Sequence, residues 1–396
     1  MRKSLIASYF CLNNIDIDRA NSKIDWNCFV KTARSDNITS LLYQEITRSS
    51  CDKIKIPPHI QKILKEDYVN TTTRNLIILQ ELNRVLGNFT DKRISVIVLK
   101  GAALLENVYQ DIGLRNLADI DLLIRKEQLP GIIQTLEQLG YTTPFNWVDY
   151  KAVTNSRYLN SIYYVRPKGK ISVILHLHWH IINTTVPAYT YGDIDVERFW
   201  QGAEPATIAN CRTKVLSPHH LIIHLSEHLL KHSYHPFILF CDLAQAISSY
   251  LNNRLDWETL ICQSREMGLQ RPVYYALYFT RRFLKIDIPE KATQRLKPEH
   301  PCFGEKKIMT LVEENKKFPE LKYFFHFVMS ETVKDKLKFV QDCIFPSREI
   351  LALQYCIPPQ EIKISHYLLK LKSACVKGLG GLTNLFSNYR KHSVHF

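Results

Sequence analysis

The chain has 396 residues, of which 45% are hydrophobic and 23% charged, a balance typical of a folded globular protein that excludes disorder as its main state. Lys and Arg number 52 against 38 Asp and Glu, a formal net charge of +14. This surplus favours anionic partners such as nucleotides, RNA or an acidic protein without choosing among them, and a solvated basic surface explains it equally well.

The cysteines and the apolar segments predict a cytoplasmic protein. The ten cysteines are scattered, with no Cys-x-x-Cys pair, as is typical of reduced thiols. The first residues, "MRKSLIASYF", have a basic start and a short apolar run, but "NNIDID" follows where a signal peptide would have its cleavage site, so a first helix is expected. No apolar run approaches the roughly 20 residues that span a bilayer, so we expect no membrane insertion.

Residues 1–90 are predicted to be helical. In "LIILQELNRVLGNF", Leu79, Leu82, Leu86 and Phe89 recur at the spacing of one helix face. The spacing of the apolar residues then changes from that of a helix to that of a strand. "ISVIVL" (94–99) is a β-branched run typical of a buried strand, and "GAALLENVY" follows as a helix that begins at Gly101.

The next predicted strand, "DIDLLI" (119–124), carries two carboxylates. Its alternation puts Asp119 and Asp121 on one face, and Ile120, Leu122 and Ile124 on the other face, in a core. Two neighbouring carboxylates on an otherwise apolar strand repel each other unless a cation lies between them. The alternative is an edge strand whose acidic face is solvated.

A helix and a hairpin are predicted after this strand. "EQLPGIIQTLEQLGY" has the pattern of a helix that ends at Gly140. "RYLNSIYYV" and "ISVILHLHW" are two strands joined by "RPKGK", which contains the Pro and Gly of a hairpin connection. In the second strand Leu175 and Leu177 share one face, and His176 and His178 share the other.

Beyond about residue 186 the sequence is predominantly helical. "SPHHLIIHLSEHLLKH" begins a helix with Ser217 as its N-cap. The basic segment "HYLLKLKSACVKGLGGL" has the character of an amphipathic helix on a membrane surface, but its apolar residues match a packed helix equally well, and packing is favoured. We therefore expect an α+β fold with a small mixed sheet in 91–185, between helical regions at 1–90 and 186–396.

Lys100 and Gly101 lie at a strand-to-helix junction. Free backbone N–H groups and the helix dipole favour a phosphate there, glycine allows close approach, and lysine adds charge. A Lys-Gly pair alone is common by chance. The Asp-x-Asp strand downstream makes it informative, because two carboxylates on one face bind Mg²⁺ and leave room for water and phosphate.

The ordered segments "LKGAAL", "GLRNLADIDLLI" and a strand ending in "LHW" resemble the uncharacterised nucleotidyltransferases of the DNA-polymerase-β-like superfamily. Segments from "IDWNCFVKTARSDNITSLLYQEI" to "LFCDLAQAI" and "IFPSREILALQY" resemble the same family, so most of the chain is covered. The resemblance implies a nucleotidyltransferase core at 91–185 and metal-dependent transfer of a nucleoside monophosphate from an NTP, such as ATP, to an acceptor. The acceptor stays open: a protein, a peptide, an RNA or a small molecule.

The resemblance also implies roles for individual residues. Asp119 and Asp121 would be catalytic and would hold the metal ions, Mg²⁺ or Mn²⁺. Gly101 would open the phosphate-binding helix, and Lys100 and Arg115 would contact the triphosphate.

One position departs from the family pattern. Superfamily members usually have a third carboxylate just before "LHW", where this chain has His176. Imidazole suits Mn²⁺ or Zn²⁺ better than Mg²⁺, and with an ordinary pKa near 6.5 it can act as a general base. We expect His176 to be catalytic, with activity that falls below about pH 6.5, and His178 to face the same cleft. Two alternatives remain: a nucleotide-binding protein or sensor with impaired catalysis, and two histidines that only pack between sheet and helix.

A second group of histidines predicts a different chemistry. "HLSEH" matches His-x-x-Glu-His, so His224, Glu227 and His228 have the spacing of a zinc hydrolase. The sequence identifies no third metal ligand. The other interpretation is a His-rich helix face that lines the cleft.

Overall fold

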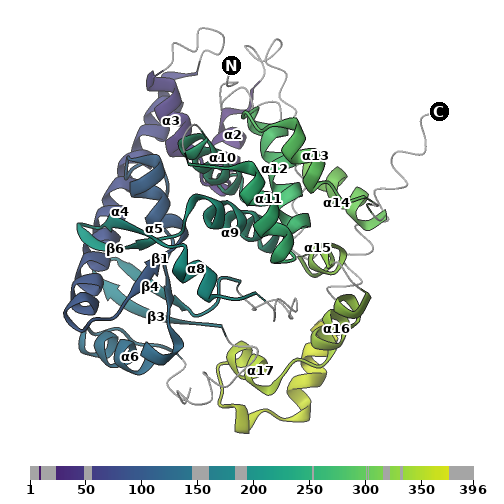
Figure 1. Ribbon diagram of the computed structural model, residues 1–396. Helices are drawn as coiled ribbons and strands as arrows, with labels where there is room; N and C mark the ends of the chain where they lie inside the picture. The colour runs from purple at the N-terminus through teal and green to yellow at the C-terminus, as the bar shows by residue number, and fades with distance from the viewer. Residues whose placement is uncertain are drawn as a thin grey trace.

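A six-stranded mixed sheet, in the order β3-β4-β2-β1-β6-β5, forms the centre of the fold (Figure 1). The computed structural model describes residues 9, 24–48, 56–144, 160–182, 194–251, 254–299, 301, 303–314, 322–330 and 333–373. The strands are β1 (Val96–Val98), β2 (Ile120–Ile124), β3 (Ser161–Lys168), β4 (Ile171–His178), β5 (Glu204–Ile208) and β6 (Cys211–Val215). Strand β2 runs parallel to β4 and antiparallel to β1, so the predicted α+β fold with a mixed sheet is confirmed.

Helices precede, interrupt and follow the sheet. The helices before β4 are α2 (Trp26–Ser35), α3 (Thr39–Arg48), α4 (Pro58–Asp91), α5 (Lys100–Leu104) with a π-helical turn (Leu105–Tyr109), and α6 (Leu129–Gln138) after a 3₁₀ turn (Lys126–Gln128). Those after β4 are α8 (Glu197–Gln201), α9 (Pro218–Lys231), α10 (Ile238–Tyr250), α11 (Trp257–Glu266), α12 (Gln270–Leu284), α13 (Glu290–Leu296), α14 (Phe303–Glu313), α15 (Lys322–Met329), α16 (Val333–Ile344) and α17 (Arg348–Tyr355), with a 3₁₀ turn (Pro359–Glu361) and a helical segment at 364–373. Within the described ranges, none of these helices is long and apolar enough to cross a bilayer.

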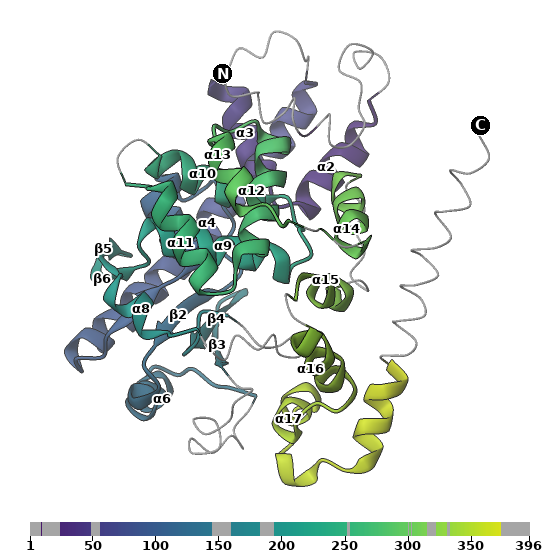
Figure 2. The ribbon, with the colours of Figure 1, turned by 45° about the vertical axis from the view of Figure 1, so that its right-hand side comes forward.

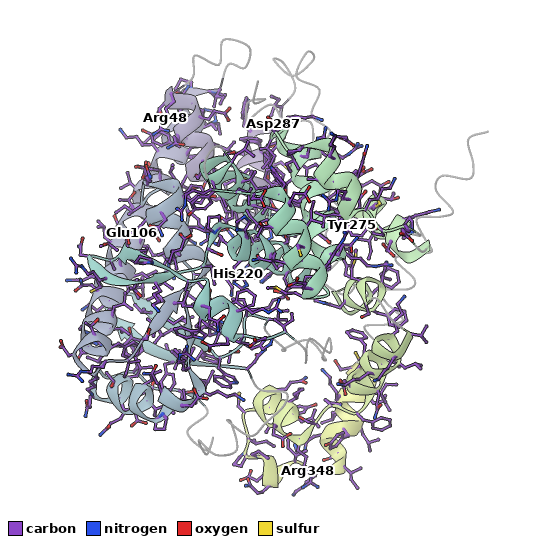
Figure 3. The ribbon with its side chains drawn as sticks, viewed as in Figure 1. Arg48, Glu106, His220, Tyr275, Asp287 and Arg348 are labelled. Carbon is purple, nitrogen blue, oxygen red and sulfur yellow. The ribbon has the colours of Figure 1, made fainter. Side chains whose placement is uncertain are left out.

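The two faces of the sheet pack into two separate cores. On one face, Ile120, Leu122 and Ile124 of β2 join Val96 and Val98 of β1 in a core with α4 and α6. On the other face, Ile97 and Leu123 join a larger core formed mainly by α9, α10 and α12. His220 of α9, labelled in Figure 3, belongs to this helical layer, and its ring lies 4.5 Å from that of Phe199 in α8. The predicted alternation of "DIDLLI" is confirmed.

Most of the predicted elements that fall on described residues are confirmed, but two strands were not anticipated. The first helix expected from "MRKSLIASYF" lies outside the described residues except for Tyr9. Strands β5 and β6 form a hairpin whose turn, Ala209-Asn210, has positive φ at both residues, and β6 pairs with β1. Only Ile208, Ala209 and Val215 are buried in this hairpin, and its other positions are partly or fully exposed, so the apolar pattern is weak. The sheet thus includes residues beyond 185, and the division of the chain into three regions stays a prediction.

The β3–β4 hairpin is longer than predicted. Its turn is Gly169-Lys170, with φ of 62° at Gly169, and pairing continues to Lys168 opposite Ile171. Pro167 therefore lies in a strand. A proline is tolerated here because β3 is at the edge of the sheet, where the N–H that proline lacks is not needed for a bond to another strand.

A buried asparagine of α4 holds the loop that leads into β2. The Asn75 side-chain amide donates to the carbonyls of Ile112 (2.6 Å) and Arg115 (2.7 Å), and its oxygen accepts from the Leu117 N–H (3.0 Å). Asn75 is fully buried. One side chain thus satisfies three backbone groups of the loop and fixes where β2 begins.

We expect Asn75→Ala to destabilise the protein by about 3 kcal/mol, because it leaves one buried and two partly buried backbone groups without their side-chain partner. Urea denaturation followed by circular dichroism measures the free energy of unfolding. Leu76→Ala, one position along on the exposed side of α4, is the matched control and should change it by less than about 0.5 kcal/mol. Equal effects of the two variants would contradict the role given to Asn75.

Candidate active site

The buried carboxylate of Asp121 is the centre of the candidate site. Its Oδ1 atom lies 2.6 Å from His178 Nε2, 3.0 Å from Lys100 Nζ and 3.7 Å from His176 Nδ1. Asp121, Lys100 and His178 are all buried. Three nitrogen-bearing side chains, two from strand β4 and one from the start of α5, therefore converge on one oxygen.

Sheet register explains this convergence. In the parallel pair of β2 and β4, Asp121 is opposite His176 and Leu123 is opposite His178, so both imidazoles and the carboxylate are on one face of the sheet. Asp119, just before β2, contacts His176 Nδ1 through Oδ2 at 3.3 Å and is more exposed than Asp121. The structure thus brings together Asp119, Asp121, His176 and His178, as predicted from the alternation.

The two histidines have opposite protonation. Burial by itself lowers the pKa of His176, but its contacts with Asp119 and Asp121 outweigh burial and raise this pKa to about 9. Burial is the dominant effect at His178 and lowers its pKa to about 4 despite the bond to Asp121. At neutral pH His176 is therefore a cation, and neutral His178 donates its Nε2–H to the carboxylate. The expectation of a neutral His176 with a pKa near 6.5 is wrong in this arrangement.

Asp121 remains ionised although it is buried. Burial alone would raise the pKa of its carboxyl group, but the charge of Lys100 and the bonds from His176 and His178 hold this pKa well below the usual value. The site thus contains a buried anion, the Asp121 carboxylate, whose charge is balanced by Lys100 and protonated His176.

Lys100 reaches Asp121 from a strained backbone position. Its φ is 44°, in the left-handed region that costs a non-glycine residue on the order of 1 kcal/mol. Gly101 follows at the start of α5. A Cβ there would lie 2.5 Å from Arg115 Nη1 and 2.9 Å from Leu117 Cδ2, so only glycine fits beneath the guanidinium. The space above Gly101 is therefore filled by Arg115.

Arg115 is engaged by an aspartate that the sequence did not single out. Its Nε and Nη2 atoms lie 2.9 Å and 3.0 Å from the two carboxylate oxygens of Asp242 in α10, and the Tyr109 hydroxyl donates to the same carboxylate at 2.8 Å. Asp242 is fully buried. The one sequence signal was an acidic residue inside the apolar run "ILFCDLAQAI". This ion pair ties the loop before β2 to the helical layer, and a contact of Arg115 with triphosphate stays a prediction.

Two histidines of α9, His224 and His228, lie near enough to the site for the charge of Lys100 to act on both. Both ring nitrogens of buried His224, and Nδ1 of His228, have no hydrogen-bond partner. Burial, with a further contribution from the charge of Lys100, keeps the pKa of both histidines well below 6.5. Among the described residues, the set of three with the geometry of a metal site is Asp121, His176 and His178, whose ligand atoms all lie within 4.8 Å of one another. His224 and His228 belong to no such set in that part of the chain.

Fold and site together have the features of a nucleotidyltransferase: a small mixed sheet with paired aspartates at the start of a central strand. A family model for an uncharacterised nucleotidyltransferase matches residues 22–285. The chain belongs to this uncharacterised nucleotidyltransferase family, which confirms the resemblance seen in the sequence. Searches of curated proteins and of solved structures find no significant match.

In protein treated with a chelator, we expect NMR titration to give a pKa of about 9 for His176 and no protonation of His178 above about pH 5, with its pKa near 4. Asp119→Asn should lower the His176 pKa, because one of its two acidic partners is lost. The raised pKa means that this proton stabilises the fold below about pH 6.5, and the contribution is lost as pH rises through 9. A His176 pKa near 6.5 in the parent protein would contradict the assigned charge state.

We expect Arg115→Met to destabilise the fold by about 3–5 kcal/mol, because Asp242 would be left as a buried charge without a cation. Arg198→Met is the matched control: Arg198 pairs with Glu266 at 2.6 Å, but both side chains are about half exposed, so the loss should be under about 1 kcal/mol. Thermal and urea denaturation measure the free energy of unfolding of both variants. Unchanged stability of Arg115→Met, with loss of NTP affinity, would show instead that the guanidinium serves the nucleotide.

Proposed function

We propose that the protein is a metal-dependent nucleotidyltransferase that moves a nucleoside monophosphate from an NTP to an acceptor hydroxyl or other nucleophile, with pyrophosphate as the leaving group. The observation that carries this proposal is the meeting of Asp119, Asp121 and His176 on one face of the sheet. Membership of the nucleotidyltransferase family supports it. The proposed roles are metal binding for the two aspartates and phosphate binding for Lys100 and Gly101.

The donor set suits Mn²⁺ better than Mg²⁺. The ligand atoms of Asp121, His176 and His178 are close enough to share one ion, and Asp119 adds a partly exposed carboxylate beside them. Carboxylates suit both ions, whereas imidazole is rare around Mg²⁺ and common around Mn²⁺ and Zn²⁺. When bound, the ion would neutralise negative charge on the phosphates during transfer of the nucleotidyl group. We therefore propose Mn²⁺ as the better cofactor and Mg²⁺ as the weaker one.

Two side chains would change partners when metal and nucleotide bind. Lys100 now pairs with the Asp121 oxygen that a metal would need, and once released it is a buried cation available to a phosphate. His176 must lose its proton before it can act as a ligand or as a base for the acceptor hydroxyl. Because its pKa is about 9, metal affinity should rise with pH up to about that value.

Calorimetry with Mn²⁺ and ATP should show that NTP affinity depends on metal and falls at least tenfold in Asp119→Asn and Asp121→Asn. Metal affinity of the parent should rise about tenfold for each pH unit between 7 and 8, because one proton of His176 is displaced. His176→Asp should remove this dependence and shift the preference towards Mg²⁺. If both asparagine variants bind metal and ATP as the parent does, the assignment of this site is wrong.

The competing proposal is a nucleotide-binding protein with impaired catalysis. Lys100 and protonated His176 already balance the charge of the two aspartates, and such a site can be stable without turnover. Incubation with each labelled NTP, Mn²⁺ or Mg²⁺ and a cell lysate discriminates between the two proposals. Label transferred to a protein, an RNA or a small molecule supports the enzyme and identifies the class of acceptor. NTP binding without transfer in the presence of either metal favours the nucleotide-binding protein with impaired catalysis.

A further inference from the structure

The C-terminal helices form a lobe of their own, which approaches the sheet at strand β3, because Cys356 after α17 acts electrostatically on Tyr163. Helices α16 and α17 and the helical segment at 364–373 lie on the opposite side of the molecule from α4 (Figures 1 and 2). Figure 3 marks this lobe by Arg348 at the start of α17. These elements follow residue 285, where the match to the nucleotidyltransferase family ends. The family match therefore assigns no role to the exposed surface of this lobe.

Two helices of this lobe expose large apolar side chains at the same spacing. On α16, Val333 and Leu337 are 73% and 67% exposed, and Val340 continues the stripe. In the segment 364–373, Ile364 and Leu368 are 78% and 61% exposed, and Leu371 continues the stripe. The positions i, i+4 and i+7 lie on one helix face. Each helix thus presents an exposed apolar stripe to its surroundings, so the favoured packing of the C-terminal basic helix does not hold for these residues.

Lysines flank both stripes. Lys334 and Lys336 lie on either side of the α16 stripe, at about 100° and 300° around the helix from Val333. Residues 363–373 contain Lys363, Lys370 and Lys372 and no acidic residue. Lys370 acts electrostatically on Cys343 of α16, so the two helices are neighbours. We name the exposed residues 333, 337, 340, 364, 368 and 371, with these lysines, the C-terminal surface.

We propose that the C-terminal surface docks on an anionic lipid bilayer, with its apolar stripes in the headgroup region and its lysines at the phosphates. Apolar stripes bordered by lysines are what an interfacial helix needs, because the lysine stems reach past the apolar residues to the anionic headgroups. A second copy of the chain would bring lysines against lysines, and an RNA would gain nothing from exposed leucines. An anionic bilayer offers phosphates to the lysines and an apolar layer to the exposed stripes.

Sedimentation of the full-length protein with vesicles tests this proposal. We expect binding to vesicles of phosphatidylcholine with phosphatidylserine, weak binding to phosphatidylcholine alone, and a loss of binding as salt is raised. Leu337→Ser combined with Leu368→Ser should lower the partition coefficient at least tenfold. Lys334→Glu combined with Lys372→Glu should lower it by about fivefold or more for each position.

Leu76→Ser is the matched control, because Leu76 is a 54% exposed leucine of α4 outside this surface. It should bind vesicles as the parent does, and circular dichroism should show the parent's helix content in every variant. The proposal is overturned if the parent does not bind anionic vesicles, or if the double serine variant binds them as well as the parent. It is also overturned if the parent sediments as a dimer that the double serine variant abolishes, because a second copy would then cover the surface.

Discussion

The ionised carboxylate of Asp121 is the constraint on which the site depends. A buried anion is stable only when charged or hydrogen-bonded partners compensate for lost hydration. Here Lys100, His178 and His176 supply them, from a helix start and from the neighbouring strand. The position of β2 beside β4 is thus an electrostatic requirement as well as a packing one.

Two buried polar contacts outside the site hold this carboxylate in place. Asn75 of α4 fixes the backbone of the loop before β2 from one side of the sheet. Asp242 of α10 holds Arg115 of the same loop from the other side. Since Arg115 lies directly over Gly101, the same ion pair also fixes the start of α5 beside Lys100. The helices before and after the sheet therefore act together on one short loop.

The sequence predicted the features that depend on local periodicity. The alternation of "DIDLLI" and "ISVILHLHW" put the aspartates and histidines on the polar face of each strand, and parallel pairing of β2 with β4 brings them together. The sequence could not predict the partner of Arg115, because Asp242 is 127 residues away along the chain. Nor could it predict the charge of His176, which depends on two carboxylates within 4 Å rather than on its own sequence neighbours. The β5–β6 hairpin was missed because an edge hairpin buries too few side chains to leave a pattern.

The central claim is that the carboxylates now paired with Lys100 and His176 form a metal site for a nucleotide. A crystal structure with Mn²⁺ and a non-hydrolysable ATP analogue tests it most directly, because anomalous scattering identifies and locates manganese. We predict a manganese peak within bonding distance of Asp119 and Asp121, with Lys100 turned from Asp121 to a phosphate. Manganese bound instead at His224 and His228, or a Lys100–Asp121 pair unchanged beside bound nucleotide, would contradict the account.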